Sequence, residues 1–260
     1  MSLLVLLSLL AVGLFLSMLL LSELGRRIGI ARLARDPDGL AKGIGTAEGA
    51  VFALLGLLIA FTFSGAGSRF EARRSLVTEE ANAISTAYLR LDLLPATAQP
   101  ELRNLFRRYV DLRTTTYQQV SKDLVAALAK LTETEALQGE IWTTALAAAR
   151  QPEAPASAPM LLLPALNAMI DITTTRKAAS QNHPPPVVFV LLIGLSLVGA
   201  LLVGYDVAGN QGRTLLHTVA FAGIMSLSVY VILDLEYPRL GLIRVDAADQ
   251  LLIDLRKSMH

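Results

Sequence analysis

The chain has 260 residues, of which 53% are hydrophobic and 17% charged, and its mean hydropathy is +0.51. This composition is typical of a membrane protein with a substantial polar part, not of a soluble protein. The formal net charge of +1 gives no indication of a nucleic-acid partner. Because the chain has no cysteine, disulfides, thiolate metal sites and cysteine nucleophiles are excluded.

Two uncharged stretches near the N-terminus are long enough to cross a bilayer. Leu3 to Leu21 lacks the basic start and the cleavage signature of a signal peptide, so it predicts an uncleaved membrane helix. Ser22 to Thr46 is a polar connection, in which Asp36-Pro37-Asp38-Gly39 has the chemistry of a turn. Ala50 to Gly67 predicts the second membrane helix.

The second membrane helix is expected to continue into water as an amphipathic helix. Small residues predict a short break at Ser64-Gly65-Ala66-Gly67, after which apolar residues recur at helical spacing. This apolar stripe consists of Phe70, Val77, Ala81, Ile84, Tyr88 and Leu91. The charged residues are expected to face away from the stripe into solvent, namely Arg69, Glu71, Arg73, Arg74, Glu79, Glu80 and Arg90.

Further helices are predicted across the polar region that ends at Pro186. Apolar stripes run from Leu102 to Val120, with Leu124 to Leu131 extending the same pattern, and from Leu137 to Ala149. The proline-rich segment 151–159 predicts a loop, and Met160 to Lys177 predicts another helix.

Two more apolar runs complete the predicted membrane part. Val187 to Gly204 and Thr214 to Leu233 are joined by a polar hairpin, and the tail ends in a short helix around Ala247 to Lys257. The sequence therefore predicts an all-α integral membrane protein with four transmembrane helices and a helical extramembrane domain inserted between the second and third. The predicted segments are 1–67 and 187–233 for the membrane helices, 68–186 for the helical domain and 234–260 for the C-terminal tail.

Short motifs along nearly the whole chain resemble a known family. They are Gly25-Arg26-Arg27, Leu55 to Ser64, Arg69-Phe70, Arg73-Arg74, Glu80 to Ile84, Thr86 to Arg90, Leu94-Pro95, Tyr109 to Arg113, and Leu233 to Arg239 with Gly241. As a set they are similar to the bacterial bestrophin-like domain proteins, which implies a bestrophin-like fold. Bestrophins proper are pentameric anion channels whose second membrane helix lines a hydrophobic neck. The acidic calcium clasp of animal bestrophins has no counterpart here, so calcium gating is not implied.

The resemblance implies a location for the pore. Aligned on Ser68-Arg69-Phe70, it places Ala53, Leu57 and Phe61 on the pore side, where apolar rings form a constriction and Thr62 contacts a passing ion. An equally apolar alternative face consists of Phe52, Gly56, Ile59 and Phe63. Contact with lipid or neighbouring helices is the structural alternative for both faces.

Charged residues lie where this pore would open. In a ring of subunits, Arg69, Arg73 and Arg74 would form a positive belt that favours anions, although basic residues in such positions also anchor to lipid headgroups. Asp234, Glu236 and Arg239 follow the fourth membrane helix. For this second group, cation binding or a gating contact with the arginines of the second helix competes with a purely structural role in surface ion pairs.

The predicted function is an oligomeric, anion-conducting channel, with the pentamer favoured, the lipid bilayer as surroundings and chloride as a typical ion. Basic residues near the membrane helices nearly balance between the two sides. The resemblance therefore decides the predicted location, a bacterial inner membrane with both termini and the helical domain cytoplasmic. The alternative is a non-conducting, membrane-anchored scaffold or sensor whose helical domain binds partner proteins. Motifs for nucleotide, phosphate or zinc chemistry are missing, so neither an enzyme nor a cofactor is predicted.

Overall fold

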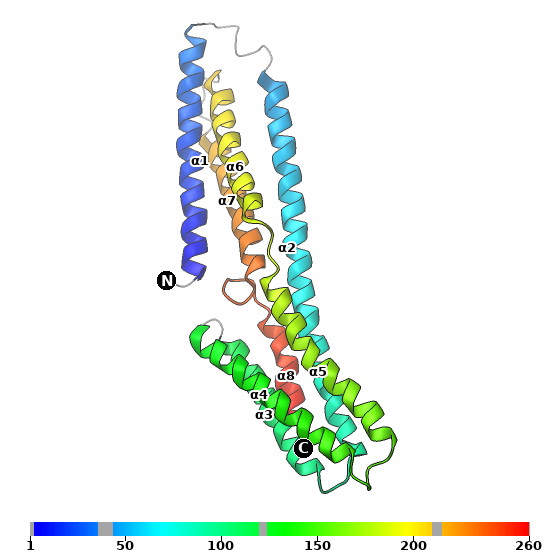
Figure 1. Ribbon diagram of the computed structural model, residues 1–260. Helices are drawn as coiled ribbons and strands as arrows, with labels where there is room; N and C mark the ends of the chain where they lie inside the picture. Colours follow the sequence, from blue (N-terminus) through cyan, green and yellow to red (C-terminus); the bar gives the residue numbers. More distant parts are fainter. Residues whose placement is uncertain (1–2, 36–43, 120–123, 210–214, 260) are drawn as a thin grey trace. The chain divides into compact units, whose positions relative to one another are not determined.

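The computed structural model describes residues 3–35, 44–119, 124–209 and 215–259, and these ranges contain helices and no strand (Figure 1). The α-helices are α1 (Leu3–Leu33), α2 (Ile44–Leu89), α3 (Gln99–Gln119), α4 (Leu124–Ala149), α5 (Ser157–Gln181), α6 (Pro186–Asp206), α7 (Leu215–Glu236) and α8 (Asp246–Ser258). Two short 3-10 helices, η1 (Arg90–Leu93) and η2 (Val207–Gly209), follow α2 and α6.

Four helical segments of the described chain are long and apolar enough to cross a membrane. They are Leu4–Leu33, Glu48–Leu93, Ser157–Asp206 and Leu216–Glu236. In the third, the uncharged stretch is α6, which begins with Pro186 at a position where a helix needs no backbone N–H. The predicted all-α membrane fold is therefore confirmed.

The first helix extends farther than predicted. α1 continues to Leu33, through residues that the sequence analysis assigned to a polar connection. Glu23 pairs with Arg26 at 2.8 Å and with Arg27 at 2.9 Å, and such pairs at helical spacing stabilise the extra turns. The predicted turn Asp36-Pro37-Asp38-Gly39 lies outside the described residues.

The predicted break in the second helix is wrong. α2 is helical without interruption through Ser64-Gly65-Ala66-Gly67. Ala66 is fully buried, and the absence of a side chain at Gly65 makes room for the Arg69 guanidinium, which would lie 3.3 Å from a Cβ atom at that position. Gly65 and Ala66 of this segment thus serve packing within a continuous helix.

Two helix boundaries in the polar region also differ from the prediction. Leu124, Leu128 and Leu131 belong to α4 and do not extend α3. α5 begins at Ser157 and so includes Pro159 in its first turn, where the missing N–H removes no helical hydrogen bond. The loop therefore ends before Pro159, which belongs to the helix.

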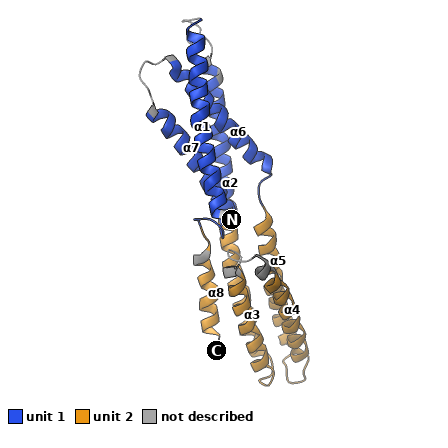
Figure 2. Cartoon of the chain, turned by 90° about the vertical axis from the view of Figure 1, so that its left-hand side faces the viewer, with its two compact units in different colours: residues 1–70, 183–243 blue, residues 71–182, 244–260 orange. Residues whose placement is uncertain are grey.

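The chain separates into two compact units, each with its own core (Figure 2). Unit 1 comprises residues 1–70 and 183–243, and unit 2 comprises residues 71–182 and 244–260. The tail residues 244–260, with α8, thus belong to the same unit as α3, α4 and α5. Unit 2 buries most of the predicted stripe, since Val77, Ala81, Ile84, Tyr88 and Leu91 are at most 8% exposed.

Within unit 1, α1 packs against α6 and α7, and its contact with α6 is unusually close (Figure 1). A Cβ atom on Gly25 would lie 2.0 Å from the Leu201 carbonyl oxygen, and one on Gly204 would lie 1.8 Å from that of Ser22. The Ser22 hydroxyl also donates to the Ala200 carbonyl at 2.8 Å. Small residues therefore bring these two backbones together, as in many membrane helix pairs.

Candidate pore face and buried charge clusters

One face of α2 is apolar and exposed in unit 1. Ala53 is exposed, and Leu57 and Phe61 are 52% and 68% exposed. At 3.6 residues per turn, Leu55 and Ala66 lie on the opposite side of the helix, where they are buried in the core of unit 1. The predicted pore residues Ala53, Leu57 and Phe61 therefore share the side of α2 that points away from that core.

The alternative apolar face is divided between packing and exposure. The Phe52 ring packs edge-on against Phe221 of α7, with centroids 5.8 Å apart, and Ile59 packs against the core of unit 1. Gly56 and Phe63 are exposed. This face therefore does not form one continuous exposed surface, in contrast to the face that carries Phe61.

Thr62 lies on the packed side of α2. Its side chain is buried, and its hydroxyl donates to the Leu58 carbonyl of the same helix at 2.7 Å. A hydroxyl engaged in this way has no need of another partner within the membrane. Its assignment to the neck stays a prediction, which the buried position disfavours.

A charged cluster in unit 1, here called the Glu236 cluster, joins three chain segments. Glu236, the last residue of α7, is 1% exposed, and Arg69 of α2 donates from Nε to its carboxylate at 2.9 Å. His183, which lies just before α6, places Nδ1 3.3 Å from the same carboxylate. The His183 ring also stacks on Tyr237 with centroids 4.8 Å apart. Glu236 thus contacts an arginine of the second helix, and the gating role of this contact stays a prediction.

Asp234 closes the loop that follows α7. Its side chain is fully buried, and its carboxylate accepts hydrogen bonds from the backbone N–H groups of Leu242 at 3.0 Å and Ile243 at 2.7 Å. A Cβ atom on Gly241 would lie 1.6 Å from this carboxylate, so only glycine fits there. Asp234 therefore holds backbone groups of the loop that follows its helix. Arg239, the third predicted contact residue, lies half-buried in that loop.

The two remaining arginines of the predicted mouth have different partners in unit 2. Arg73 is buried and donates to the carbonyl groups of Ala179 at 3.0 Å and Asn182 at 2.9 Å, at the end of α5. A cation is favoured there because the carbonyl end of a helix is partly negative. Arg74 is exposed and lies 3.5 Å from Glu71, one turn away. The prediction that Arg73 faces solvent is therefore wrong.

Unit 2 contains a second charged cluster, here called the Glu80 cluster, which the sequence analysis missed. Glu80 of α2 is fully buried, although it was predicted to face solvent. Arg113 of α3 donates to its carboxylate at 2.5 Å, and Arg176 of α5 pairs with it as well. Two arginines thus compensate the desolvation of one carboxylate, which explains how a charged side chain can be buried next to the apolar stripe.

A neutral polar pair lies beside the Glu80 cluster. Tyr109 of α3 is fully buried and accepts a hydrogen bond from Gln138 of α4 at 3.1 Å. Burial raises the pKa of the Tyr109 phenol to about 12. The tyrosine therefore stays neutral at physiological pH and serves as a hydrogen-bonding group in the core of unit 2.

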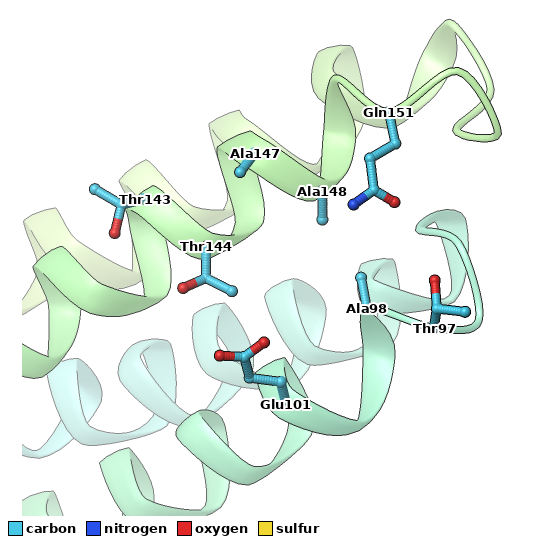
Figure 3. Close-up of a pocket in the computed structure, with 8 residues that line it drawn as sticks. All are labelled: Thr97, Ala98, Glu101, Thr143, Thr144, Ala147, Ala148 and Gln151. Carbon is cyan, nitrogen blue, oxygen red and sulfur yellow. The ribbon is translucent and has the colours of Figure 1, made fainter.

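A shallow polar groove of about 560 Å³ lies between the start of α3 and the end of α4 (Figure 3). Its polar lining includes Glu101, Thr144 and Gln151, whereas the Thr143 hydroxyl is bound to carbonyl groups of its own helix. No group of three histidine or acidic side chains in the described parts of the chain is placed to hold a metal ion. The groove thus lacks the charge and enclosure of a defined ligand site.

The fold and these clusters define a class, the multi-pass helical membrane proteins that carry a second helical unit between membrane helices. Residues 32–249 match the model of the Bestrophin-like domain, and the chain belongs to this family. The fold is similar to crystal structures of a bacterial bestrophin homologue from Klebsiella pneumoniae. One mutant form is 15% identical with a TM-score of 0.72, covering 94% of this chain and 99% of the other.

A second structure of the Klebsiella pneumoniae bestrophin homologue, solved by Zn-SAD phasing, is 14% identical to this chain. Its TM-score is 0.68, and the match covers 92% of this chain and 97% of the other. Identities this low establish the shared fold and nothing finer. No curated protein sequence matches the chain.

Proposed function

We propose that the protein is one subunit of an oligomeric membrane channel that conducts inorganic anions such as chloride. The exposed apolar face of α2 carries the proposal, since Ala53, Leu57 and Phe61 lie together opposite the packed side of the helix. Membership of the Bestrophin-like domain family supports it. In a closed ring, favoured here as a pentamer, these residues surround the axis.

An apolar face around an axis can act as a gate. Rings of leucine and phenylalanine side chains exclude water from a narrow path, and widening of the path lets water and ions enter. Leu57 and Phe61 are the largest side chains on this face and therefore set the width of the proposed neck. Ala53 leaves a wider path one turn away from Leu57.

Arg69, Arg73 and Arg74 are the proposed source of anion preference, and their partners rank them. The charge of Arg69 is compensated by Glu236, whereas the described partners of Arg73 include the neutral carbonyl groups of Ala179 and Asn182. Arg74 is the most exposed of the three. We therefore propose that Arg74 is the arginine of the three that is most accessible to a passing anion.

The proposed location is a bacterial inner membrane, with both termini and unit 2 in the cytoplasm. The support for this orientation is the resemblance to bestrophins. A protease added to sealed inner-membrane vesicles of known orientation would cleave unit 2 only where the cytoplasmic face is outside. Cleavage only in vesicles of the opposite orientation would reverse the proposal.

The first test is the oligomeric state of the detergent-purified protein, measured by native mass spectrometry. A discrete ring, expected to be a pentamer, supports an axial path, and a monomer or dimer leaves none. Chloride flux into liposomes is the second test. Absence of flux above leak from a stable oligomer, across a range of pH and calcium, would favour the non-conducting scaffold.

A matched pair of substitutions tests the proposed face of α2. Phe61→Ala is expected to raise basal chloride flux severalfold, because it removes the largest side chain from the neck. Phe63→Ala makes the same change at a residue that is 49% exposed but points about a third of a turn or more away from Leu57. Equal flux from the two variants would reject this face as the pore lining.

A further inference from the structure

The Glu236 cluster is placed where three helices of unit 1 can be tied together. Arg69 comes from α2, Glu236 ends α7, and His183 precedes the Pro184-Pro185-Pro186 run that leads into α6. The two basic side chains meet at the Glu236 carboxylate, which is almost completely excluded from solvent. The strength of the contacts to Glu236 therefore affects how firmly the end of α7 is held to α2 and to the segment that enters α6.

The two basic side chains of the cluster differ in kind. An arginine guanidinium keeps its charge throughout the pH range in which proteins are folded. Histidine gains and loses its proton within the physiological range. The His183 side chain is 29% exposed, so it can exchange a proton with water while its Nδ1 atom faces the buried carboxylate.

We propose that His183 and Glu236 form a proton-sensitive latch, in which protonation of the imidazole strengthens the link between the end of α7 and the segment entering α6. A neutral imidazole offers the carboxylate at most one hydrogen bond. A protonated imidazole adds a positive charge, whose attraction to the carboxylate is weakly screened because Glu236 is 1% exposed. Stacking on Tyr237 fixes the ring in the orientation that both states need.

Other charged groups of the described residues lie near the latch. Arg69 approaches from α2, and Arg239 lies in the loop after α7. The Asp234 carboxylate is already bound to the backbone N–H groups of Leu242 and Ile243. The membrane stretch of α1 from Leu3 to Leu21 and that of α6 up to Gly204 contain no ionisable side chain. His183 is the imidazole among these groups.

The latch is defined by contacts within unit 1 and does not require that the protein conducts. Where α2 lines a pore, as proposed above, the same latch would make flux depend on pH. The decisive experiment is accordingly a stability measurement, so that failure of the latch and failure of the channel proposal remain separate results.

The test is the thermal unfolding midpoint of the full-length protein in detergent at about pH 5.5 and about pH 8. His183→Gln is expected to lower the midpoint by about 2–4 °C at the lower pH and by much less at the higher pH. His217→Gln is the control, because it changes an exposed histidine of α7 outside the cluster. Its effect on the unfolding midpoint should be the same at both pH values. A His183→Gln effect that is equal at both pH values would overturn the proposal.

Glu236→Gln completes a double-mutant cycle. The coupling between His183→Gln and Glu236→Gln is expected to be larger at about pH 5.5 than at about pH 8. If either variant does not fold, hydrogen exchange of the wild-type protein decides the matter. After correction for the intrinsic pH dependence, peptides covering residues 231–243 should be more protected at the lower pH, and equal or weaker protection there contradicts the latch.

Discussion

The two units solve the same electrostatic problem with different degrees of closure. Each buries one glutamate and compensates it with two basic side chains from other segments, Arg69 and His183 for Glu236, and Arg113 and Arg176 for Glu80. In the Glu236 cluster the basic side chains are 25% and 29% exposed, whereas in the Glu80 cluster they are 3% and 9% exposed. The Glu236 cluster is therefore accessible to water, whereas the Glu80 cluster is enclosed in the core of unit 2.

The largest effect is expected from Glu80→Gln. The substitution leaves Arg113 and Arg176 buried without their carboxylate, and breaking a buried pair in this way costs about 3–5 kcal/mol. Thermal unfolding in detergent and the yield of folded protein measure the loss. Glu79→Gln is the matched control, because the neighbouring glutamate is exposed. Similar stability of the two variants would show that Arg113 and Arg176 do not need the Glu80 carboxylate.

A smaller loss is expected from Glu236→Gln. Its partners Arg69 and His183 can turn towards solvent, so the cost should be about 1–3 kcal/mol, the range for a buried hydrogen-bonding group that loses its partner. The same unfolding assay at neutral pH measures it. A loss larger than that of Glu80→Gln would contradict the contrast between an accessible and a sealed cluster.

Tyr109→Phe tests the neutral part of the sealed core. Loss of the phenol oxygen deprives Gln138 of the nearer of its two acceptors, leaving Thr173 at 3.5 Å, and should cost about 1 kcal/mol. Because burial raises the pKa of the folded-state phenol from 10.0 to about 12, the unfolded state loses this proton first as the pH rises. The wild-type protein should therefore lose stability between about pH 10 and pH 12, and Tyr109→Phe should lose less over that range. Parallel pH profiles would argue against a buried phenol.

The smallest effect is expected from Arg74→Gln. Arg74 and Glu71 are both well exposed and only 3.5 Å apart, and such surface pairs contribute about 0–1 kcal/mol. Its unfolding midpoint should match that of wild type within error, while chloride flux falls if Arg74 adds to the potential at the mouth. Unchanged flux with unchanged stability would remove Arg74 from the proposed mouth.

The membrane helices could be predicted because an uncharged run has few alternatives. Leu3 to Leu21 and Val187 to Gly204 contain no charge that would have to be buried in lipid, so length alone identified them. The end of α1 could not be found in this way. Residues 22–33 include several charged side chains, and their helical structure depends on local ion pairs and on the glycine contacts with α6.

The charge clusters were harder to predict, because a stripe analysis assigns every charged residue to solvent. Glu80 lies among charged neighbours in sequence, yet its partners Arg113 and Arg176 are 33 and 96 residues away. No residue near Glu80 in the sequence indicates that these two arginines are its partners. For Glu236, a contact with the arginines of the second helix was one of the alternatives that the sequence left open, whereas no sequence pattern singled out His183.

The contact between α1 and α6 has a mechanical consequence. At Gly25 and at Gly204, a carbonyl oxygen of one helix occupies the space that a side chain would fill on the other. Rolling or sliding of either helix would drive backbone into backbone, so we expect the pair to behave as one stiff strut. α2 meets the rest of unit 1 through side chains such as Phe52 and Leu55, whose rotamers can adjust. Motion that alters the exposed face of α2 is therefore expected to be a tilt of this one helix against a stationary frame.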